Sequence, residues 1–309
     1  MTLQFTVLGS GSSGNAALLR LNGFGLLLDA GLGPRQLAKR LATIGSSWDD
    51  IHSAILTHVH SDHWKDTTLN QLHRRDIPLH CHDGHHSALL EYGSSFADLC
   101  EKKLVRSYGS RESITLAPGL TCLPLPLNHD CGDTFGFRFD ATVNDRSLSI
   151  GYVADLGSWN SNLANNLANV NLLAIEFNHD VQLEKTSGRA PQLISRVLGD
   201  FGHLSNDQAC ELIEEVLRGS TPGRLRHIVQ LHLSRDCNRP AIAAEAAQNI
   251  LAKHRPAIEI HTASPTEPSP TWTLSSNHLG AATNKNPRPR GAKLRATAGV
   301  QPLLPFMEE

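Results

Sequence analysis

The sequence predicts an α/β fold, a layered domain in which helices pack on a mixed β-sheet. Two observations lead to this prediction. The early apolar segments follow one another as strands joined by hairpin turns, and the later ones alternate with helical patterns. Hairpins place neighbouring strands antiparallel, whereas alternation of strand and helix is typical of parallel neighbours. No internal period indicates a repeat array, and two similar β-rich halves are compatible with the pattern.

The individual elements follow from local signals. A strand at residues 3–10 leads into the loop "GSGSSGN", and a hairpin follows whose turn is Asn22-Gly23. Pro34 at a first helical position and Gly45 as a stop predict a helix within residues 31–45. Further strands are predicted at residues 51–58, 77–82, 120–130, 135–157, 171–180, 225–234 and 257–263, and further helices at 190–198, 205–218 and 241–254.

Composition changes after Thr262. The segment that follows is rich in Pro, Ser, Thr, Asn and Gly and has little periodicity, so it offers too few apolar side chains to offset the entropy cost of ordering. The sequence therefore predicts one catalytic domain at residues 1–263 and a disordered tail at residues 264–309. The basic stretch at residues 285–295 is interpreted as a solvated part of this tail, with contact to a phosphate backbone as the alternative.

Bulk properties narrow the class of protein. The 309 residues are 40% apolar and carry a net charge of −2, which argues against a strongly basic nucleic-acid-binding protein. A nuclease whose positive charge is local or carried by metal stays compatible with this balance. The six cysteines form no Cys-x-x-Cys pair, and residues 1–10 read as a strand and not as a signal peptide. We therefore expect a cytoplasmic protein with reduced thiols and no membrane span.

The strongest chemical signal is the segment "THVHSDHW", from Thr57 to Trp64. Given the 17 histidines in the chain, its His-x-His-x-Asp-His pattern should arise by chance only about 0.003 times in this length. Imidazole and carboxylate together suit zinc, manganese or iron. His58 and His60 share one side of an extended chain, and Asp62 and His63 follow a turn. Four ligands so close would crowd one ion, so the spacing predicts two.

Three further candidates each follow directly after an apolar strand. They are His129 in "LPLNHD", Asp155 in "GYVADLG" and His232 in "VQLHLS". Each alone would more often be a capping or hydrogen-bonding residue. Together with the histidine segment they supply the ligands that a dinuclear site needs.

These motifs in this order resemble the metallo-β-lactamase fold over roughly residues 2–262. The resemblance implies an αββα sandwich, in which two mixed β-sheets are flanked by helices and the metals lie at one edge of the sheets. It also implies a division of the ligands. One metal would be held by His58, His60 and His129, the other by Asp62, His63 and His232, and Asp155 would bridge them.

Four segments resemble the YycJ/WalJ group more closely, which is similar to the ribonuclease Z branch of the superfamily. They are "GSGSSGN", "EFNHD" (Glu176–Asp180), "GHLSND" (Gly202–Asp207) and "LHLSRDCN" (Leu231–Asn238). The resemblance implies an exonuclease that acts on DNA more readily than on RNA. Val59 stands where the group commonly has a glutamate, but its side chain alternates away from the ligands.

The mechanism that the resemblance implies is dinuclear phosphodiester hydrolysis with zinc or manganese, or else iron, and a metal-bridging hydroxide as nucleophile. Asp62 would orient the hydroxide, and His203, held by Glu176, would protonate the leaving oxygen or stabilise the transition state. A helix-entry role for His203 and a strand-end role for Glu176 are the structural alternatives. The candidate substrate-binding residues are Ser12, Ser13 and Asn15, with Ser10, in the glycine-rich loop, and His179, Arg235 and Asn238 further on.

Other interpretations of the sequence are kept open. The enzyme alternative is a small-molecule phosphodiester or thioester hydrolase of the same fold, and the non-enzyme alternative is a scaffold that binds nucleic acid or a repair protein. A homodimer is compatible with either. His80, His82, His85 and His86 in "HCHDGHH" are interpreted as surface histidines, because the chain already has its seven ligands.

Overall fold

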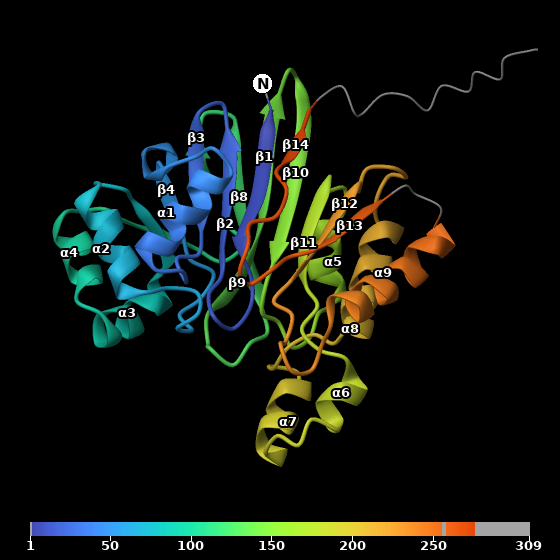
Figure 1. Ribbon diagram of the computed structural model, residues 1–309. Helices are drawn as coiled ribbons and strands as arrows, with labels where there is room; N and C mark the ends of the chain where they lie inside the picture. Colours follow the sequence, from blue (N-terminus) through green and yellow to red (C-terminus); the bar gives the residue numbers. More distant parts are fainter. Residues whose placement is uncertain (1, 255–257, 276–309) are drawn as a thin grey trace, which may run out of the picture. The chain divides into compact units, whose positions relative to one another are not determined.

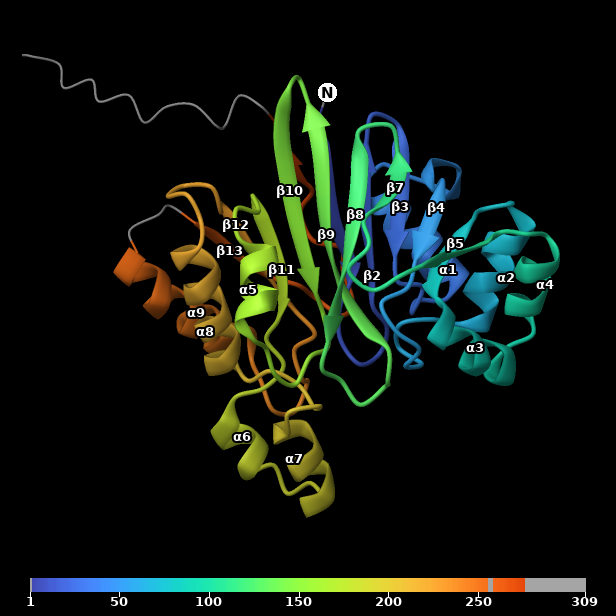
Figure 2. The ribbon, with the colours of Figure 1, turned by 180° about the vertical axis from the view of Figure 1, so that it is seen from behind.

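The computed structural model describes residues 2–254 and 258–275. Two seven-stranded β-sheets pack face to face, and helices cover the outer face of each sheet (Figures 1 and 2). This four-layered arrangement confirms the αββα sandwich of two mixed sheets. No helix within the described residues is long and apolar enough to cross a membrane.

The first sheet has the strand order β14-β1-β2-β3-β4-β5-β6. Its strands are β1 (Leu3–Gly9), β2 (Ala16–Leu21), β3 (Phe24–Leu28), β4 (Ser53–Ile55), β5 (Leu79–His82), β6 (Val105–Tyr108) and β14 (Trp272–Leu274). Pairing is antiparallel from β14 to β3 and parallel from β3 to β6. The predicted hairpin turn lies between β2 and β3, where Asn22 has a φ of 50° and Gly23 a φ of 88°, as a two-residue hairpin of this type requires.

The second sheet repeats this plan in the order β13-β12-β11-β10-β9-β8-β7. Its strands are β7 (Ile114–Ala117), β8 (Leu120–Leu127), β9 (Thr134–Val143), β10 (Arg146–Val153), β11 (Leu172–Glu176), β12 (His227–Leu231) and β13 (Glu259–Thr262). Pairing is antiparallel from β7 to β10 and parallel from β10 to β13. Each sheet thus combines a meander with parallel strands, which is the mixture of patterns found along the sequence.

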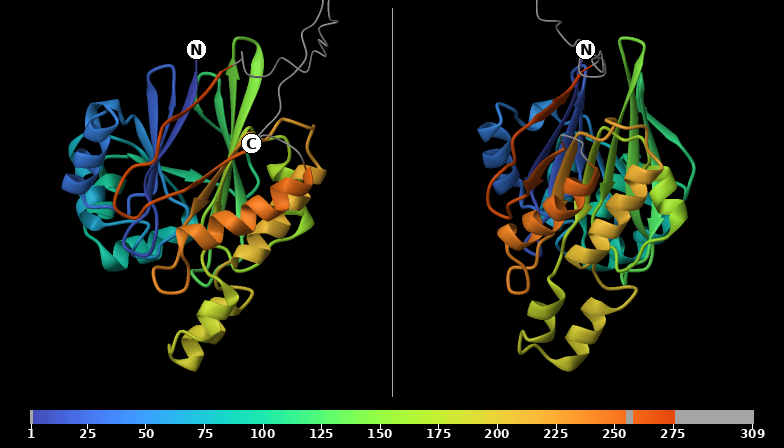
Figure 3. Two further views of the ribbon diagram at one scale, coloured as in Figure 1. Left: turned by 45° about the vertical axis from the view of Figure 1, so that its right-hand side comes forward. Right: turned by 90° about the vertical axis from the view of Figure 1, so that its right-hand side faces the viewer.

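Helices form the two outer layers. The first sheet is covered by α1 (Pro34–Thr43), α2 (Asp66–Arg74), α3 (His86–Tyr92) and α4 (Ser95–Glu101), and the second by α5 (Ser161–Leu167), α8 (Asn206–Arg218) and α9 (Pro240–His254) (Figures 1 and 3). Two short helices, α6 (Val181–Lys185) and α7 (Pro191–Leu198), project beyond the sheet at one end. The helices α2 to α6 were not predicted, because most have only seven to nine residues and few apolar side chains.

The core explains why the inner strands are apolar at almost every position. Alternate residues such as Phe5 and Leu19 face the second sheet, where they meet Phe137 and Ile150. The residues between them, such as Leu18, pack beneath the helices. Strands buried on both faces read as continuous apolar runs and not as polar–apolar alternation.

The predicted domain boundary is too early. Residues 264–275, assigned to the disordered tail, contain β14, which pairs with β1. Trp272 is buried and stacks on Phe5. Two apolar anchors, Trp272 and Leu274, suffice to order this segment, although its overall composition is polar and rich in proline. The rest of the predicted tail, residues 276–309 with the basic stretch, lies outside the described residues.

Candidate metal centre

The predicted ligands converge where the ends of strands from both sheets meet. The segment 58–63 follows β4, His129 follows β8, Asp155 follows β10 and His232 follows β12. Among the described residues, three groups of side chains have ligand atoms within 4.8 Å of one another. The first donor group is His58, His60, His129 and Asp155; the second is Asp62, His63, Asp155 and His232; the third is Asp155, Glu176, His203 and His232.

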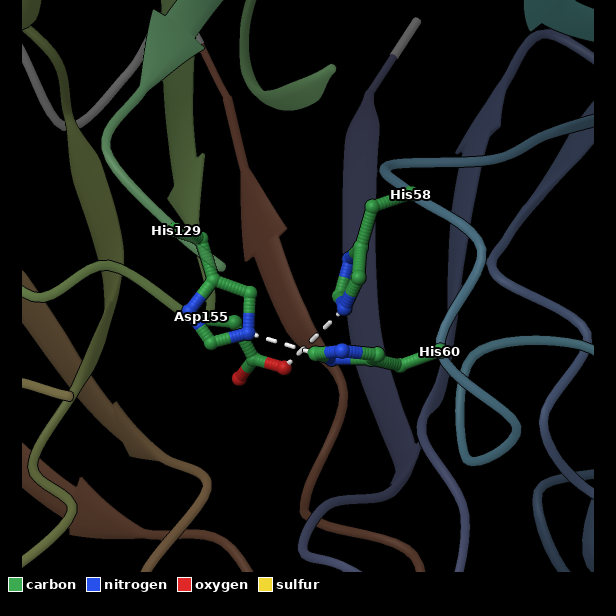
Figure 4. Close-up of side chains that lie close together, drawn as sticks. All are labelled: His58, His60, His129 and Asp155. Atoms are coloured by element: carbon green, nitrogen blue, oxygen red, sulfur yellow. Dashed lines mark hydrogen bonds and ion pairs between the residues drawn. The ribbon is translucent and has the colours of Figure 1, made fainter. Parts of the chain in front are cut away.

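The first donor group is rich in imidazole (Figure 4). His129 Nε2 lies 3.1 Å from His60 Nδ1, and His58 Nε2 lies 3.4 Å from Asp155 Oδ2. His58 Nε2 is buried and, within the described residues, has no hydrogen-bond partner. Burial lowers the pKa values of His58 and His60, so both rings are neutral and present lone pairs. Buried lone pairs that point at one another suit a cation.

The second donor group contains two carboxylates and two imidazoles. Asp155 Oδ2 lies 2.9 Å from His63 Nε2, and its Oδ1 lies 2.7 Å from His232 Nδ1. Asp62 Oδ2 is 3.2 Å from His232 Nε2. Burial alone would lower the pKa of His63, but Asp155 and Asp29 outweigh burial and raise it to about 10. Asp155 belongs to both groups, because its Oδ2 lies near His58 of the first group as well as near His63 of the second.

Glu176 and His203 form a hydrogen-bonded pair in the third donor group, next to Asp155 and His232. His203 Nδ1 lies 2.7 Å from Glu176 Oε1, while Glu176 Oε2 accepts hydrogen bonds of 3.0 Å from the backbone N–H groups of Leu156 and Leu204. Burial opposes ionisation of Glu176, but His203 and His232 outweigh it and lower the pKa of Glu176 to about 2. The ionised carboxylate therefore fixes His203 beside the segment that carries Asp155.

Asp29 was not predicted, although it holds the second donor group in place. It follows β3, is fully buried, and its Oδ2 accepts a 2.8 Å hydrogen bond from His63 Nδ1. Its Oδ1 accepts bonds of 2.9 Å and 3.0 Å from the backbone N–H and the hydroxyl of Thr57. Because Nδ1 of His63 is occupied, Nε2 is the nitrogen that faces the centre. The signal was present, since Asp29 comes directly after an apolar strand, as Asp155 does.

The backbone of three residues at the centre adopts an uncommon conformation. Asp29, Asp155 and His232 have positive φ values of 60°, 46° and 52°. A non-glycine residue in this conformation costs on the order of 1 kcal/mol, and such residues cluster at functional sites. Here each of them turns the chain sharply at the end of a strand, which directs its side chain back over the sheet edge.

Two residues of the glycine-rich loop brace ligands. Asn15, predicted to bind substrate, donates from Nδ2 to Asp62 Oδ2 at 3.1 Å and accepts from Gly11 N at 2.8 Å. Ser10 Oγ accepts a 2.8 Å bond from the backbone N–H of His232. Gly31 presses against the same turn, since a Cβ there would lie 1.7 Å from the carbonyl oxygen of Asp62. The loop and the residues after β3 thus lock the second donor group from two sides.

Four other candidate substrate residues lie together. Ser12, Ser13, Arg235 and Asn238 line one pocket of about 450 Å³. Ser12, Ser13 and Arg235 are exposed there, whereas the buried Asn238 amide is bonded to Asn206 and to the carbonyl oxygen of Phe177. His179 is not part of this pocket; it is buried, and neither ring nitrogen has a hydrogen-bond partner within the described residues.

The histidines of "HCHDGHH" are not all on the surface. His85 is only 1% exposed, and its Nε2 lies 2.7 Å from the carbonyl oxygen of Asp133. Its ring packs near Tyr108 and Phe135. The surface interpretation is therefore wrong for His85, because a strand-to-helix turn here folds back over the inter-sheet core. None of these histidines belongs to a donor group found in the described part of the chain.

Comparisons with known proteins agree with this geometry. The model of the β-lactamase superfamily domain matches residues 25–268. The exodeoxyribonuclease YycJ of Bacillus anthracis is 27% identical over 275 residues, which are 87% of this chain and 98% of that protein. The exodeoxyribonuclease WalJ of Streptococcus pneumoniae is also 27% identical, over 81% of this chain and 88% of its own length.

Solved structures share the fold at low identity. The metallo-β-lactamase fold protein YhfI from Bacillus subtilis has a TM-score of 0.63 at 17% identity and covers 89% of this chain and 100% of its own. A long form of RNase Z from yeast has a TM-score of 0.54 at 12% identity and covers 77% of this chain and 38% of its own. Since the family model matches most of the chain, the protein belongs to the β-lactamase superfamily and is a hydrolase of the metallo-β-lactamase fold.

Proposed function

We propose that this hydrolase is a dinuclear, metal-dependent phosphodiesterase that digests nucleic acid from an end, with DNA as its substrate in preference to RNA. The observation that carries the proposal is Asp155, which lies in both donor groups: its Oδ2 is 3.4 Å from His58 Nε2 of the first and 2.9 Å from His63 Nε2 of the second. The two relatives named exodeoxyribonuclease, aligned over more than four fifths of this chain, support the choice of substrate.

The donor set fits two divalent cations. Buried His58 Nε2 has no hydrogen-bond partner among the described residues, which is costly unless a cation lies beside it. His60 Nδ1 and His129 Nε2, which are 3.1 Å apart, belong to the same group of ligand atoms. We assign one ion to the first donor group and one to the second, with Asp155 common to both. Mixed imidazole and carboxylate ligands favour zinc or manganese, and iron is compatible with them.

The roles of the side chains follow from their contacts. When bound, a pair of such ions polarises a phosphoryl oxygen and makes water a stronger nucleophile near neutral pH. Asp62 is held by Asn15 and His232, so its carboxylate orients the attacking water. His203 is held by Glu176, and the carboxylate raises the pKa of His203 against the effect of burial. His203 therefore carries the proton that passes to the leaving oxygen.

The experiment that tests this function compares substrates. The metal-loaded protein is assayed against end-labelled single- and double-stranded DNA, RNA and bis-nitrophenyl phosphate. Asp62→Ala is measured beside Asp98→Ala, a matched change at an exposed aspartate remote from the centre. We expect mononucleotides from DNA, with activity lost in Asp62→Ala only. Cleavage of the small diester alone would favour a small-molecule hydrolase, and metal-independent binding without turnover would favour the scaffold.

A further inference from the structure

A pocket beside the first donor group has no role in the mechanism above. It has a volume of about 600 Å³, and its lining includes Val59, His60, Trp64, Lys65 and Tyr92. We call it the Tyr92 pocket. Its volume lies within the range of small-molecule sites and is sufficient for a nucleotide. Since His60 is one of the candidate ligands, the pocket opens directly onto the centre.

Tyr92 presents an aromatic ring to solvent. It is 71% exposed, the most exposed of the large hydrophobic side chains in the described residues. Apolar rings that stay exposed beside a site commonly serve binding, because covering them is favourable. The position of Tyr92 at the end of α3 places this ring at the rim of the pocket and not in a core.

The support beneath Tyr92 is fixed, although the ring is exposed. Asp66 accepts a 2.8 Å hydrogen bond from Ser95 N, and this bond ties the start of α2 to the start of α4. Gly93 lies so close to Trp64 that a Cβ there would be 3.1 Å from the indole ring. The indole N–H of Trp64 in turn donates a 3.0 Å bond to the carbonyl oxygen of Val59. These contacts hold the backbone at the end of α3, which carries Tyr92, against the loop that carries His58 and His60.

An available ammonium and access to the centre favour a nucleotide as the occupant. The lining carries one lysine and one carboxylate, Lys65 and Asp66, and Asp66 is engaged by the backbone N–H of Ser95. Within the described part of the chain the half-buried Lys65 forms no ion pair, so its ammonium is available to a phosphate. The side chain of His60 is 32% exposed, whereas His58, His129 and Asp155 are buried. The first donor group is thus open to solvent on the side of the Tyr92 pocket, and a strand that reaches the centre passes over this pocket.

We propose that the Tyr92 pocket is a base-stacking subsite. The base next to the scissile phosphodiester stacks on Tyr92, and Lys65 contacts the adjoining phosphate. This inference rests on the proposed function and favours strands with an unpaired end as the substrate, since a base inside a duplex has both faces covered by its neighbours. Aromatic stacking accepts every base, so the subsite positions the strand without reading its sequence.

Kinetics of position-specific variants test the subsite. Tyr92→Ala should raise KM for a single-stranded oligonucleotide roughly 5- to 100-fold, the range expected for one lost stacking contact. Tyr92→Trp should keep the wild-type KM. Leu90→Ala is the matched control, since Leu90 is on the same helix and 53% exposed but does not line the pocket.

An abasic nucleotide next to the scissile bond separates stacking from other effects. It should raise KM for the wild type as Tyr92→Ala does, and it should have no further effect on Tyr92→Ala. Equal sensitivity of the two proteins to the abasic nucleotide, or wild-type kinetics of Tyr92→Ala on DNA, would overturn the subsite alone. If the metal-loaded wild type cleaves no nucleic acid, the proposed function fails and the subsite with it.

Discussion

The two donor groups share Asp155 but are built differently. The second group is braced from behind: His63 by Asp29, Asp62 by Asn15, and the backbone of His232 by Ser10. The first group has fewer such partners, namely Gly202 O for His129 and Thr57 for His58. Among the described residues, the polar partners of the His60 ring are His129 and the partly exposed Asp130.

This difference indicates that the two groups have different roles. Ligands held by buried hydrogen bonds keep one geometry, whereas an exposed ligand can adjust to what enters the site. We therefore expect the second group to hold its ion more firmly and the first, which is open beside His60, to be the side where substrate is admitted.

The largest expected effect comes from the residue that both groups share. Asp155→Ala should lower hydrolysis of bis-nitrophenyl phosphate by about 1,000-fold or more, because each ion loses a ligand. Metal analysis of the purified variant should find fewer ions than in the wild type. Full metal content with full activity would contradict a shared carboxylate.

Removing one ligand from each group tests their independence. His129→Ala and Asp62→Ala should each lose about one ion per chain, as measured by metal analysis after dialysis, because their ligand atoms serve different groups. Loss of both ions in either variant would mean that the centre binds metal as one unit. Asp98→Ala should keep the wild-type content.

A smaller effect is expected from the residues that brace the second group. Asp29→Asn should weaken binding of the ion by roughly 10- to 100-fold, the usual consequence of removing the partner of a ligating histidine. Competition with a chromogenic chelator measures this change. His60→Ala removes a ligand of the less braced first group and is measured beside Asp29→Asn. If the first ion in His60→Ala were bound more tightly than the second ion in Asp29→Asn, the expected difference between the two groups would be contradicted.

The last comparison is between two buried histidines and separates the effect of burial from that of charge. His63 and His85 are both buried, but carboxylate oxygens bond directly only to the ring of His63. At His85 burial outweighs the attraction of Asp133 and Asp29 and lowers the pKa to about 4. The unfolded pKa is near 6.5, so the unfolded chain takes up the proton first, and stability falls as pH decreases from 6.5 to 4. The loss is at most about 3 kcal/mol.

Denaturant unfolding between pH 4 and pH 7 measures this loss. His85→Gln should show a shallower pH dependence than the wild type, because its side chain does not titrate. His86→Gln, a change at the next residue, is the control. An unchanged slope in His85→Gln would mean that other groups dominate acid destabilisation.

Sequence patterns were sufficient to predict the site residues that are identified by their immediate neighbours in the chain. The histidine segment and the residues after β8, β10 and β12 could be found because each directly follows a strand with a clear apolar pattern. Asp29 and the bracing role of Asn15 could not be assigned, because their partners, His63 and Asp62, are more than thirty residues away. Those contacts depend on the pairing of β3 with β4. The apolar periodicity of a segment indicates a strand but not its partner strand.

The position of β14 determines when the first sheet can be completed during folding. The chain passes from β13, at the edge of the second sheet, to β14, at the edge of the first, where it pairs with β1 (Figure 3). On the way, Ser264 O accepts from Ser10 N, and Pro265 O accepts from Arg40. During synthesis β1 therefore remains an open edge until residues 264–275 emerge, and open edges invite pairing between chains. The last described strand is thus what protects the first from aggregation.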